Sequence, residues 1–339
     1  MLGNPEYIGI DIGQYAIKIA RVKKAGKSFV SNYFVYEILP EEMRGGKDKE
    51  GLKNLIAKIL KTHKIIKGQP VIHVNSGDTI MRNIVLPENT SQEAVEGAIE
   101  LDLGQSLPFS LDQVYFDFDE TKDANGGHLA IAARRDLIDD KTALFAGKAK
   151  TLNNPQVDVD VFAYERLVEN LVQAGRIYGS TIAIMDIGYT HSRISVYQDG
   201  KYVFVREPQI GGNQVSEIIR DVYDLDLESA ESKKLNQNLG EEYQELVLMP
   251  YVSSLSEQMN LALDFYEASS PDAKAIEKIY ITGGGAQLKG LVLALTEKVN
   301  VPLELLDLSQ FIKLQSKQTD LLQDGINHGL AIALALEGK

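Results

Sequence analysis

The chain has no cysteine among its 339 residues, which excludes disulfide bonds and thiolate chemistry and fits a reducing compartment. Histidine is scarce as well: there are five, and none has a partner at the spacing of a metal site. A zinc site is therefore not expected. His73, in a short apolar segment that reads as a strand, is interpreted as a hydrogen-bonded core residue.

Basic residues are fewer than acidic residues. Lysine and arginine number 35 against 48 aspartates and glutamates, giving a net charge of −13 and a pI of about 5.0. Binding to a phosphate backbone relies on concentrated lysine and arginine. Nucleic acid is therefore not an expected partner.

Long hydrophobic runs are also missing. The longest, Leu330 to Leu336, is far shorter than the roughly 20 residues that span a bilayer. The N-terminal residues enter a strand at once, without the basic and apolar regions of a signal peptide. Hydrophobic content of 44% and charged content of 24% are typical of a globular protein, and the length suits two domains. We expect a cytoplasmic protein without direct membrane insertion.

One pattern occurs twice. At residues 7–22 and again at 182–197, an apolar strand runs into Asp-Ile-Gly and then into a second, alternating strand, with the aspartates at Asp11 and Asp186. Glycine lets such a turn aim N–H groups at a phosphate, and the carboxylate beside it can hold hydrated Mg²⁺ through water. Two facing copies would clamp a nucleotide from both sides.

A third segment has a related form. Residues 279–290 read as a strand that runs into Gly283, Gly284 and Gly285 and then into a helix. Without side chains, this backbone can lie against a planar base or a ribose. The alternative, unrelated turns in an α/β protein, is weakened because all three elements occur together.

In this order and at these separations, the three elements resemble the phosphate-1, phosphate-2 and adenosine motifs of the actin-like ATPase superfamily over nearly the whole chain. Residues 98–109, 206–214 and 230–234 narrow the likeness to the PilM family of type IV pilus assembly. The resemblance implies an α/β, two-lobed actin-like ATPase fold with an inserted α/β subdomain in the first lobe. It also implies ATP and Mg²⁺ as ligands.

The site residues implied by the resemblance come from all three motifs. Lys18, seven residues after Asp11, matches a lysine on the phosphates; the alternative is a solvent-facing strand lysine. Gly211 and Gly212 precede a helix, whose first N–H groups would be free to bind an anion. The residues expected to bind nucleotide are Asp11, Gly13, Gln14, Tyr15, Lys18, Asp186, Gly188, Thr190, Gly211, Gly212, Asn213, Glu231, Lys234, Gly283, Gly284, Gly285, Ala286 and Lys289, with Asp11 and Asp186 holding the metal through water.

Two features depart from the superfamily pattern. Gln14, Tyr15 and Ala16 stand where the first phosphate loop usually carries hydroxyls. In addition, no confident water-activating residue precedes the second motif, where Asp160 and Glu165 are the only candidates to orient a water for hydrolysis. Glu231 and Lys234, three apart on an expected helix, match ribose and base contacts, although a solvated ion pair is the alternative. We expect at most a slow ATPase, with no confident catalytic residue.

The domain boundaries follow from the same pattern. The first lobe is expected to comprise residues 1–83, 161–178 and a C-terminal helix at 322–339. The inserted subdomain is expected at 84–160. The second lobe is expected at 179–321, with a smaller sublobe around 226–270.

The inserted subdomain is expected to bind a peptide. In PilM-like proteins it helps to form the groove for the N-terminal cytoplasmic tail of a PilN-like inner-membrane protein, with Leu107, Pro108 and Phe109 as the lining expected here. Such a protein would be peripheral at the inner membrane through that partner. Pilus motor ATPases are further candidate partners.

Three other functions are alternatives. A small-molecule kinase of the same superfamily needs an acidic substrate pocket, for which the second half shows no distinctive motif. An FtsA-like filament protein would end in a basic amphipathic helix, whereas this chain ends Glu337-Gly-Lys339. A Rossmann dehydrogenase is disfavoured because no G-x-G-x-x-G follows the first strand.

Overall fold

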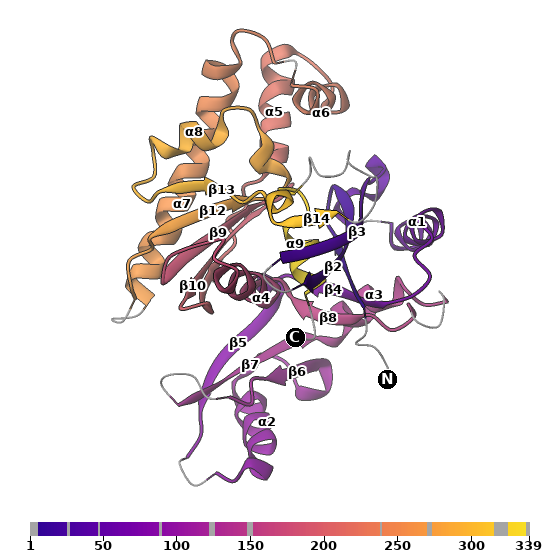
Figure 1. Ribbon diagram of the computed structural model, residues 1–339, viewed down its shortest axis with the longest axis vertical. Coiled ribbons are helices and arrows are strands. Elements are labelled where there is room, and N and C mark those ends of the chain that lie inside the picture. The colour runs from indigo at the N-terminus through magenta and orange to yellow at the C-terminus, as the bar shows by residue number, and fades with distance from the viewer. Residues whose placement is uncertain are drawn as a thin grey trace.

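Three β-sheets and the helices around them build the molecule (Figure 1). The computed structural model describes residues 6–25, 28–46, 48–87, 90–121, 126–147, 152–237, 239–269, 273–314 and 325–336. Within these ranges, no helix is both long and apolar enough to cross a lipid bilayer.

The first half is built on a six-stranded sheet in the order β14-β3-β2-β1-β4-β8. Alternation along β1 sends Ile8 and Ile10 to one face, while Gly9 faces the other. The strands are β1 (Tyr7–Ile12), β2 (Ala16–Ala25), β3 (Ser28–Ile38), β4 (Gln69–Val74), β8 (Gln156–Val159) and β14 (Ile312–Leu314).

The second half repeats this plan in a five-stranded sheet, in the order β11-β10-β9-β12-β13. The antiparallel pair β9 and β10 corresponds to β1 and β2. Asp199 and Gly200, both with positive φ, form the hairpin turn between β10 and β11, as an Asp-Gly pair between alternating strands favours. The strands are β9 (Thr181–Ile187), β10 (Ser192–Gln198), β11 (Lys201–Arg206), β12 (Lys278–Thr282) and β13 (Leu303–Leu305).

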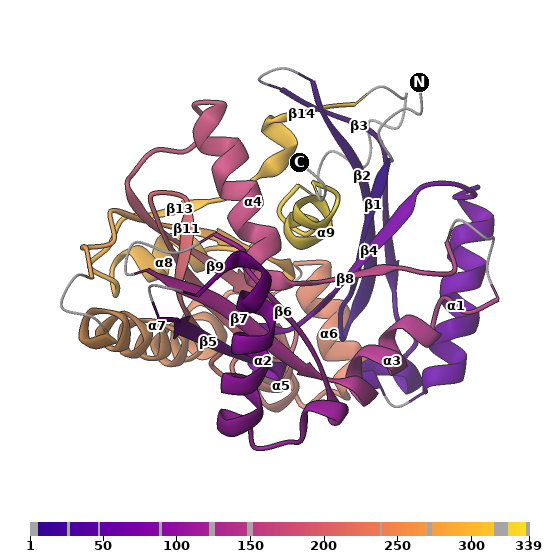
Figure 2. The same ribbon diagram turned by 90° about the horizontal axis from the view of Figure 1, so that it is seen from below.

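Two helices lie between the two large sheets, α4 (Asp160–Gln173) and α9 (Gly329–Leu334) (Figure 2). Side chains from both sheets and both helices, among them Val71, Ile184, Leu167 and Ile332, share one buried cluster. The apolar C-terminal segment is buried on all sides because it is enclosed in this way. The two halves are therefore joined along one core.

Five further helices cover the outer sides of the two large sheets. In α1 (Lys49–Thr62), Leu52 and Ile56 pack on the Ile8 and Ile10 face of the first sheet. The second sheet is covered by α5 (Gly212–Tyr223), α7 (Met249–Ser269) and α8 (Leu291–Thr296), and α6 (Leu227–Leu235) packs beside α5.

A separate three-stranded sheet extends from the first half, in the order β5 (Thr79–Val85), β7 (Gly127–Arg134) and β6 (Val114–Phe118). Its own small core joins the helix α2 (Val95–Ser106) to the sheet through Ile99 and Leu103. The helix α3 (Arg135–Ala143) follows β7 directly.

Strand pairing places several segments differently from the boundaries expected above. β5 begins at Thr79, before the insertion expected at 84–160, and β8, expected inside that insertion, pairs with β4 in the six-stranded sheet. β14, expected in the second lobe, pairs with β3 of the first. Within the expected C-terminal helix at 322–339, α9 begins at Gly329, and residues 322–324 and 337–339 lie outside the described part.

Candidate functional site

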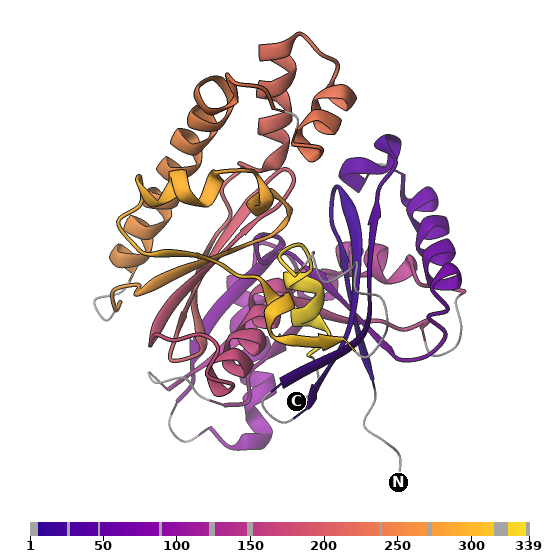
Figure 3. The ribbon, with the colours of Figure 1, turned by 45° about the horizontal axis from the view of Figure 1, so that its top comes forward.

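A cavity of about 670 Å³ opens between the two halves, and we call it the interlobe cavity. Figure 3 shows these halves side by side, with the yellow α9 at their junction. All three glycine motifs contribute to its lining through Gly13, Gly188, Gly284 and Gly285. The fold thus brings together segments that are far apart in the sequence.

In the first motif, the Asp11 carboxylate is held by two neighbours. Asp11 and Lys18 are cross-strand partners in β1 and β2, and the Lys18 ammonium donates to Asp11 Oδ2 at 3.0 Å. His73 Nε2 of β4 lies 3.3 Å from Asp11 Oδ1. Burial by itself would raise the pKa of Asp11, but Lys18 and His73 outweigh it and hold the pKa well below its usual range. Asp11 is therefore a charged carboxylate in the cavity wall.

The second motif repeats this geometry with a different cation. Asp186 and Arg193 are cross-strand partners in β9 and β10, and Arg193 Nη2 donates to Asp186 Oδ2 at 3.1 Å. The Tyr164 hydroxyl of α4 donates to the same oxygen at 2.8 Å. Arg193 thus stands seven residues after its aspartate, as Lys18 does after Asp11.

Arg193 also links the two halves of the molecule. Its other terminal nitrogen donates to Asp160, the first residue of α4, and Glu207 lies 4.0 Å from it. Glu207 accepts hydrogen bonds from Ser76 Oγ at 2.8 Å and from Gly77 N at 3.3 Å, just before β5. This network ties the second motif to the start of the inserted sheet.

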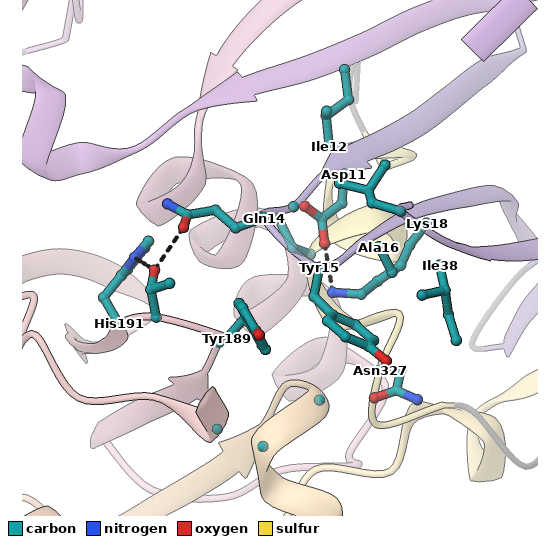
Figure 4. Close-up of a pocket in the computed structure, with 18 of the residues that line it drawn as sticks. Asp11, Ile12, Gln14, Tyr15, Ala16, Lys18, Ile38, Tyr189, His191 and Asn327 are labelled. Atoms are coloured by element: carbon teal, nitrogen blue, oxygen red, sulfur yellow. Dashed lines mark hydrogen bonds and ion pairs between the residues drawn. The ribbon is translucent and has the colours of Figure 1, made fainter. Parts of the chain in front are cut away.

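The loop after Asp11 and the loop after Asp186 contact each other across the cavity (Figure 4). Thr190 Oγ1 donates to Gln14 Oε1 at 2.8 Å, and the rings of Tyr15 and Tyr189 have centroids 5.0 Å apart. The side chains that replace the usual hydroxyls therefore make contacts between the loops.

The glycines of the third motif have different tasks. Gly283 has a φ of 91°, and a Cβ there would meet the main chain of Ile187. A Cβ on Gly285 would collide with the Ile187 side chain. A Cβ on Gly284 would meet only Asn327 Oδ1, at 3.5 Å. Gly283 and Gly285 are thus required by the packing of β12 on β9, while Gly284 faces the cavity.

Lys234 and Glu231 do line the cavity, and they are paired with each other. Lys234 Nζ donates to Glu231 Oε2 and Ser216 Oγ at 2.8 Å and to Gly212 O at 2.9 Å. Burial lowers the pKa of Lys234, and the Glu231 carboxylate opposes that effect. The two residues thus form an ion pair that is largely buried, and their contacts with ribose and base stay a prediction.

The expectation that α5 offers free N–H groups to an anion is wrong. Gly212 N donates to Gly188 O at 2.9 Å, and Asn213 N donates to Tyr189 O at 2.8 Å. The first two N–H groups of α5 are therefore already hydrogen-bonded to carbonyl oxygens of the second loop, and these bonds hold that loop in place. Their contribution to a ligand site is to position Gly188 and Tyr189.

Several expected nucleotide residues do not line the cavity. Gly211 caps α5 and packs against Tyr189, and Gly283 supports the turn after β12. The expected residues outside the cavity lining are Gly211, Asn213, Gly283, Ala286 and Lys289. The other thirteen expected residues, from Asp11 to Gly285, do line it.

The two candidates for orienting a water are also elsewhere. Asp160 is fully buried and accepts from Ser76 N at 3.1 Å as well as from Arg193. Glu165 accepts from Lys201 Nζ at 2.9 Å and from Tyr202 N at 2.7 Å. Neither carboxylate lines the cavity, and each accepts hydrogen bonds from neighbouring segments instead.

Sequence reasoning missed several cavity residues. His73 was interpreted as a core residue, yet it lines the cavity beside Asp11; Arg193 and Asn327 also line it. The spacing from Asp186 to Arg193, equal to that from Asp11 to Lys18, was a signal that could have identified Arg193. His73 and Asn327 had no such signal because only the tertiary fold brings them to the site.

The residues expected to bind a peptide lie at the end of α2. Leu107 packs in the small core of the inserted subdomain, whereas Pro108 and Phe109 are exposed. The Arg134 guanidinium lies 5.8 Å from the centre of the Phe109 ring. Among the described strands, β6 pairs only with β7, so one edge of β6 is open.

Comparisons with known proteins agree with this architecture. The family model of the type IV pilus assembly protein PilM matches residues 9–339. The chain is similar to a structure described as the PilM–PilN type IV pilus biogenesis complex, with 22% identity, 98% of each chain covered and a TM-score of 0.77.

More distant structures share the fold. Ethanolamine utilization protein EutJ from Carboxydothermus hydrogenoformans has 13% identity, a TM-score of 0.54 and coverage of 98% of this chain and 90% of that one. MreB5 of Spiroplasma citri bound to ADP has 13% identity, a TM-score of 0.51 and 95% coverage of both chains. The expected actin-like fold is therefore confirmed, and the chain belongs to the PilM family of type IV pilus assembly proteins.

Proposed function

We propose that this protein is a nucleotide-binding scaffold of type IV pilus assembly that binds ATP with Mg²⁺ in the interlobe cavity. The observation that carries the proposal is the convergence of the two Asp-Ile-Gly loops and Gly284 on one cavity of about 670 Å³. That volume suits a ligand of nucleotide size. Gly284 presents no side chain there, which leaves room for a flat group.

The donors present also fit a phosphate chain with its metal. Lys18 supplies a cation, and Asp11 supplies a carboxylate that stays charged. Mg²⁺ usually keeps several waters and binds through one or two carboxylates together with substrate phosphates. Asp11 and Asp186, which both line the cavity, would hold the ion through its waters. The ion would neutralise phosphate charge.

A scaffold role is favoured over rapid hydrolysis. Asp160 and Glu165 are both engaged outside the cavity, which leaves neither of them to orient a water. This supports slow turnover at most, and the nucleotide would then serve chiefly to hold the two halves together.

The second part of the proposal concerns the partner. We propose that the inserted subdomain captures the N-terminal cytoplasmic tail of a PilN-like inner-membrane protein, which would hold this chain at the membrane periphery. The open edge of β6 supports strand addition by an extended peptide. Phe109 and Tyr115, which are 37% and 42% exposed, supply apolar contacts beside that strand.

The nucleotide site is tested by Gly284→Val, with titration calorimetry of ATP in the presence of Mg²⁺. Valine would project into the cavity with little protein in its way, so we expect an unchanged fold and at least about a tenfold loss of affinity, equivalent to 1.4 kcal/mol. Gly97→Val is the matched control because Gly97 is exposed on α2 with nothing within 4 Å of its Cβ position. Equal affinities for both variants and the wild type would refute the site.

A further inference from the structure

The helix α3 brings a lysine to the interlobe cavity that the sequence motifs do not include. Lys141, in the last turn of α3, lines the cavity together with Asp11, His73 and Asn75. It is half-buried. Within the part of the chain that the structure describes, no hydrogen bond or ion pair is formed by its ammonium.

The other cations that line the cavity each have a carboxylate partner. These pairs are Lys18 with Asp11 at 3.0 Å, Lys49 with Asp140 at 2.5 Å, Arg193 with Asp186 at 3.1 Å and Lys234 with Glu231 at 2.8 Å. Lys141 differs because Asp78, Asp11 and Asp160 act on it through their charge, without a hydrogen bond or an ion pair among the described residues. Among the described residues, it is the cavity-lining lysine whose ammonium has no hydrogen-bond partner.

Such a group is suited to an anionic ligand. Burial lowers the pKa of Lys141, while the charges of Asp78, Asp11 and Asp160 oppose that effect. An ammonium taken from water regains stability when a charged acceptor reaches it. A phosphate oxygen is such an acceptor.

The position of Lys141 indicates which phosphate it would meet. Gly284, Gly285 and Lys234 belong to the second half, whereas Lys141 reaches the cavity from the first half, on the side of Asp11. A nucleotide with its base near Gly284 and its phosphates between Gly13 and Gly188 would direct its last phosphate toward that side.

We propose that Lys141 binds the terminal phosphate of a nucleoside triphosphate in the interlobe cavity and makes the protein prefer triphosphate over diphosphate. This inference rests on the proposed function, since it requires a nucleotide in the cavity. Because α3 begins at Arg135, directly after β7 ends at Arg134, the same contact would connect the terminal phosphate to the central strand of the inserted sheet.

A purely structural role for Lys141 makes a different prediction. If the lysine only balances Asp11, Asp78 and Asp160, its removal changes the unfolding transition but alters ATP and ADP affinity alike. The ratio of the two affinities therefore separates the roles.

The experiment is titration calorimetry of ATP and of ADP, each with Mg²⁺ present, on the wild type, Lys141→Met, Lys141→Arg and Lys278→Met, at one ionic strength. We expect Lys141→Met to lose about tenfold in ATP affinity, as for one charge-assisted hydrogen bond, with ADP affinity unchanged. Arginine should restore the preference. Lys278→Met, which removes a lysine paired with Glu304 outside the cavity lining, should leave both affinities unchanged.

Hydrogen exchange supplies a second measurement. The amides of α3 should exchange more slowly with ATP than with ADP in the wild type, and this difference should vanish in Lys141→Met. An unchanged ratio of ATP to ADP affinity in Lys141→Met would overturn the role of Lys141, while ADP binding would still uphold the nucleotide site. A wild type that binds neither nucleotide would overturn both.

Discussion

At the residue scale, the two halves place a cation opposite each motif aspartate. Lys18 faces Asp11, and Arg193 faces Asp186, because a seven-residue separation makes them cross-strand partners in each hairpin. A role for Lys18 was predicted from its motif. Arg193 was overlooked although its spacing is the same, and its link to Asp160 of the other half is visible only in the folded chain.

The free energy of unfolding that the Asp11 carboxylate contributes depends on pH. Because its pKa is held below the ordinary value of about 3.9, the ionised carboxylate stabilises the fold above that value. This stabilisation is lost as the pH falls below about 4 toward the folded pKa. Asp11→Asn should be less stable than the wild type by about 3 kcal/mol at pH 7, since it leaves the Lys18 ammonium without its partner.

Urea unfolding of both proteins at a series of pH values checks this. The stability difference should shrink as the pH drops below about 4. Asp199→Asn is the control, because its pair with Lys274 is exposed and should contribute less than about 1 kcal/mol. A difference for Asp11→Asn that stays constant down to acid pH would contradict the account.

At the scale of elements, alternation in the sequence predicted the hairpins well. β1, β2, β9 and β10 are strongly patterned, and their pairing follows from short connections. The short strands β8 and β14 were assigned to other units because each is set by a partner far away in the chain, β4 and β3 respectively. The occupied amides at the start of α5 depend on a loop more than twenty residues upstream, so no local pattern reveals them.

The contact between α9 and β1 gives a test at this scale. A Cβ on Gly9 would collide with Ala331 O and lie 2.7 Å from Ala335 N, both main-chain atoms that cannot rotate away. Gly9→Ala should therefore destabilise the fold by about 1–3 kcal/mol, the usual effect of overpacking. Gly97→Ala, on exposed helix surface, should be neutral or stabilising by up to about 1 kcal/mol. Equal unfolding midpoints in urea for the two variants would show that the α9 contact is looser than described.

At the scale of the whole molecule, two proposed sites lie on one chain. The interlobe cavity is formed by both halves, and the open β6 edge belongs to the inserted sheet. The Glu207 contacts with Ser76 and Gly77 run between these regions, just before β5. The motifs predicted the cavity, but the route from it to the inserted sheet could not be predicted, because only the folded chain brings Glu207 to Ser76 and Gly77.

The central claim is that this protein is a scaffold that captures a membrane partner's tail while its cavity holds nucleotide. Fluorescence anisotropy of a labelled N-terminal tail of the PilN-like protein, titrated with the wild type, tests this most directly. We predict saturable binding that falls about tenfold in Phe109→Ala, the loss typical of an aromatic anchor. ATP affinity of that variant should be unchanged, and Leu293→Ala, an exposed leucine on α8, should bind the tail normally. A tail that does not bind the wild type, or binds Phe109→Ala equally well, would contradict the account.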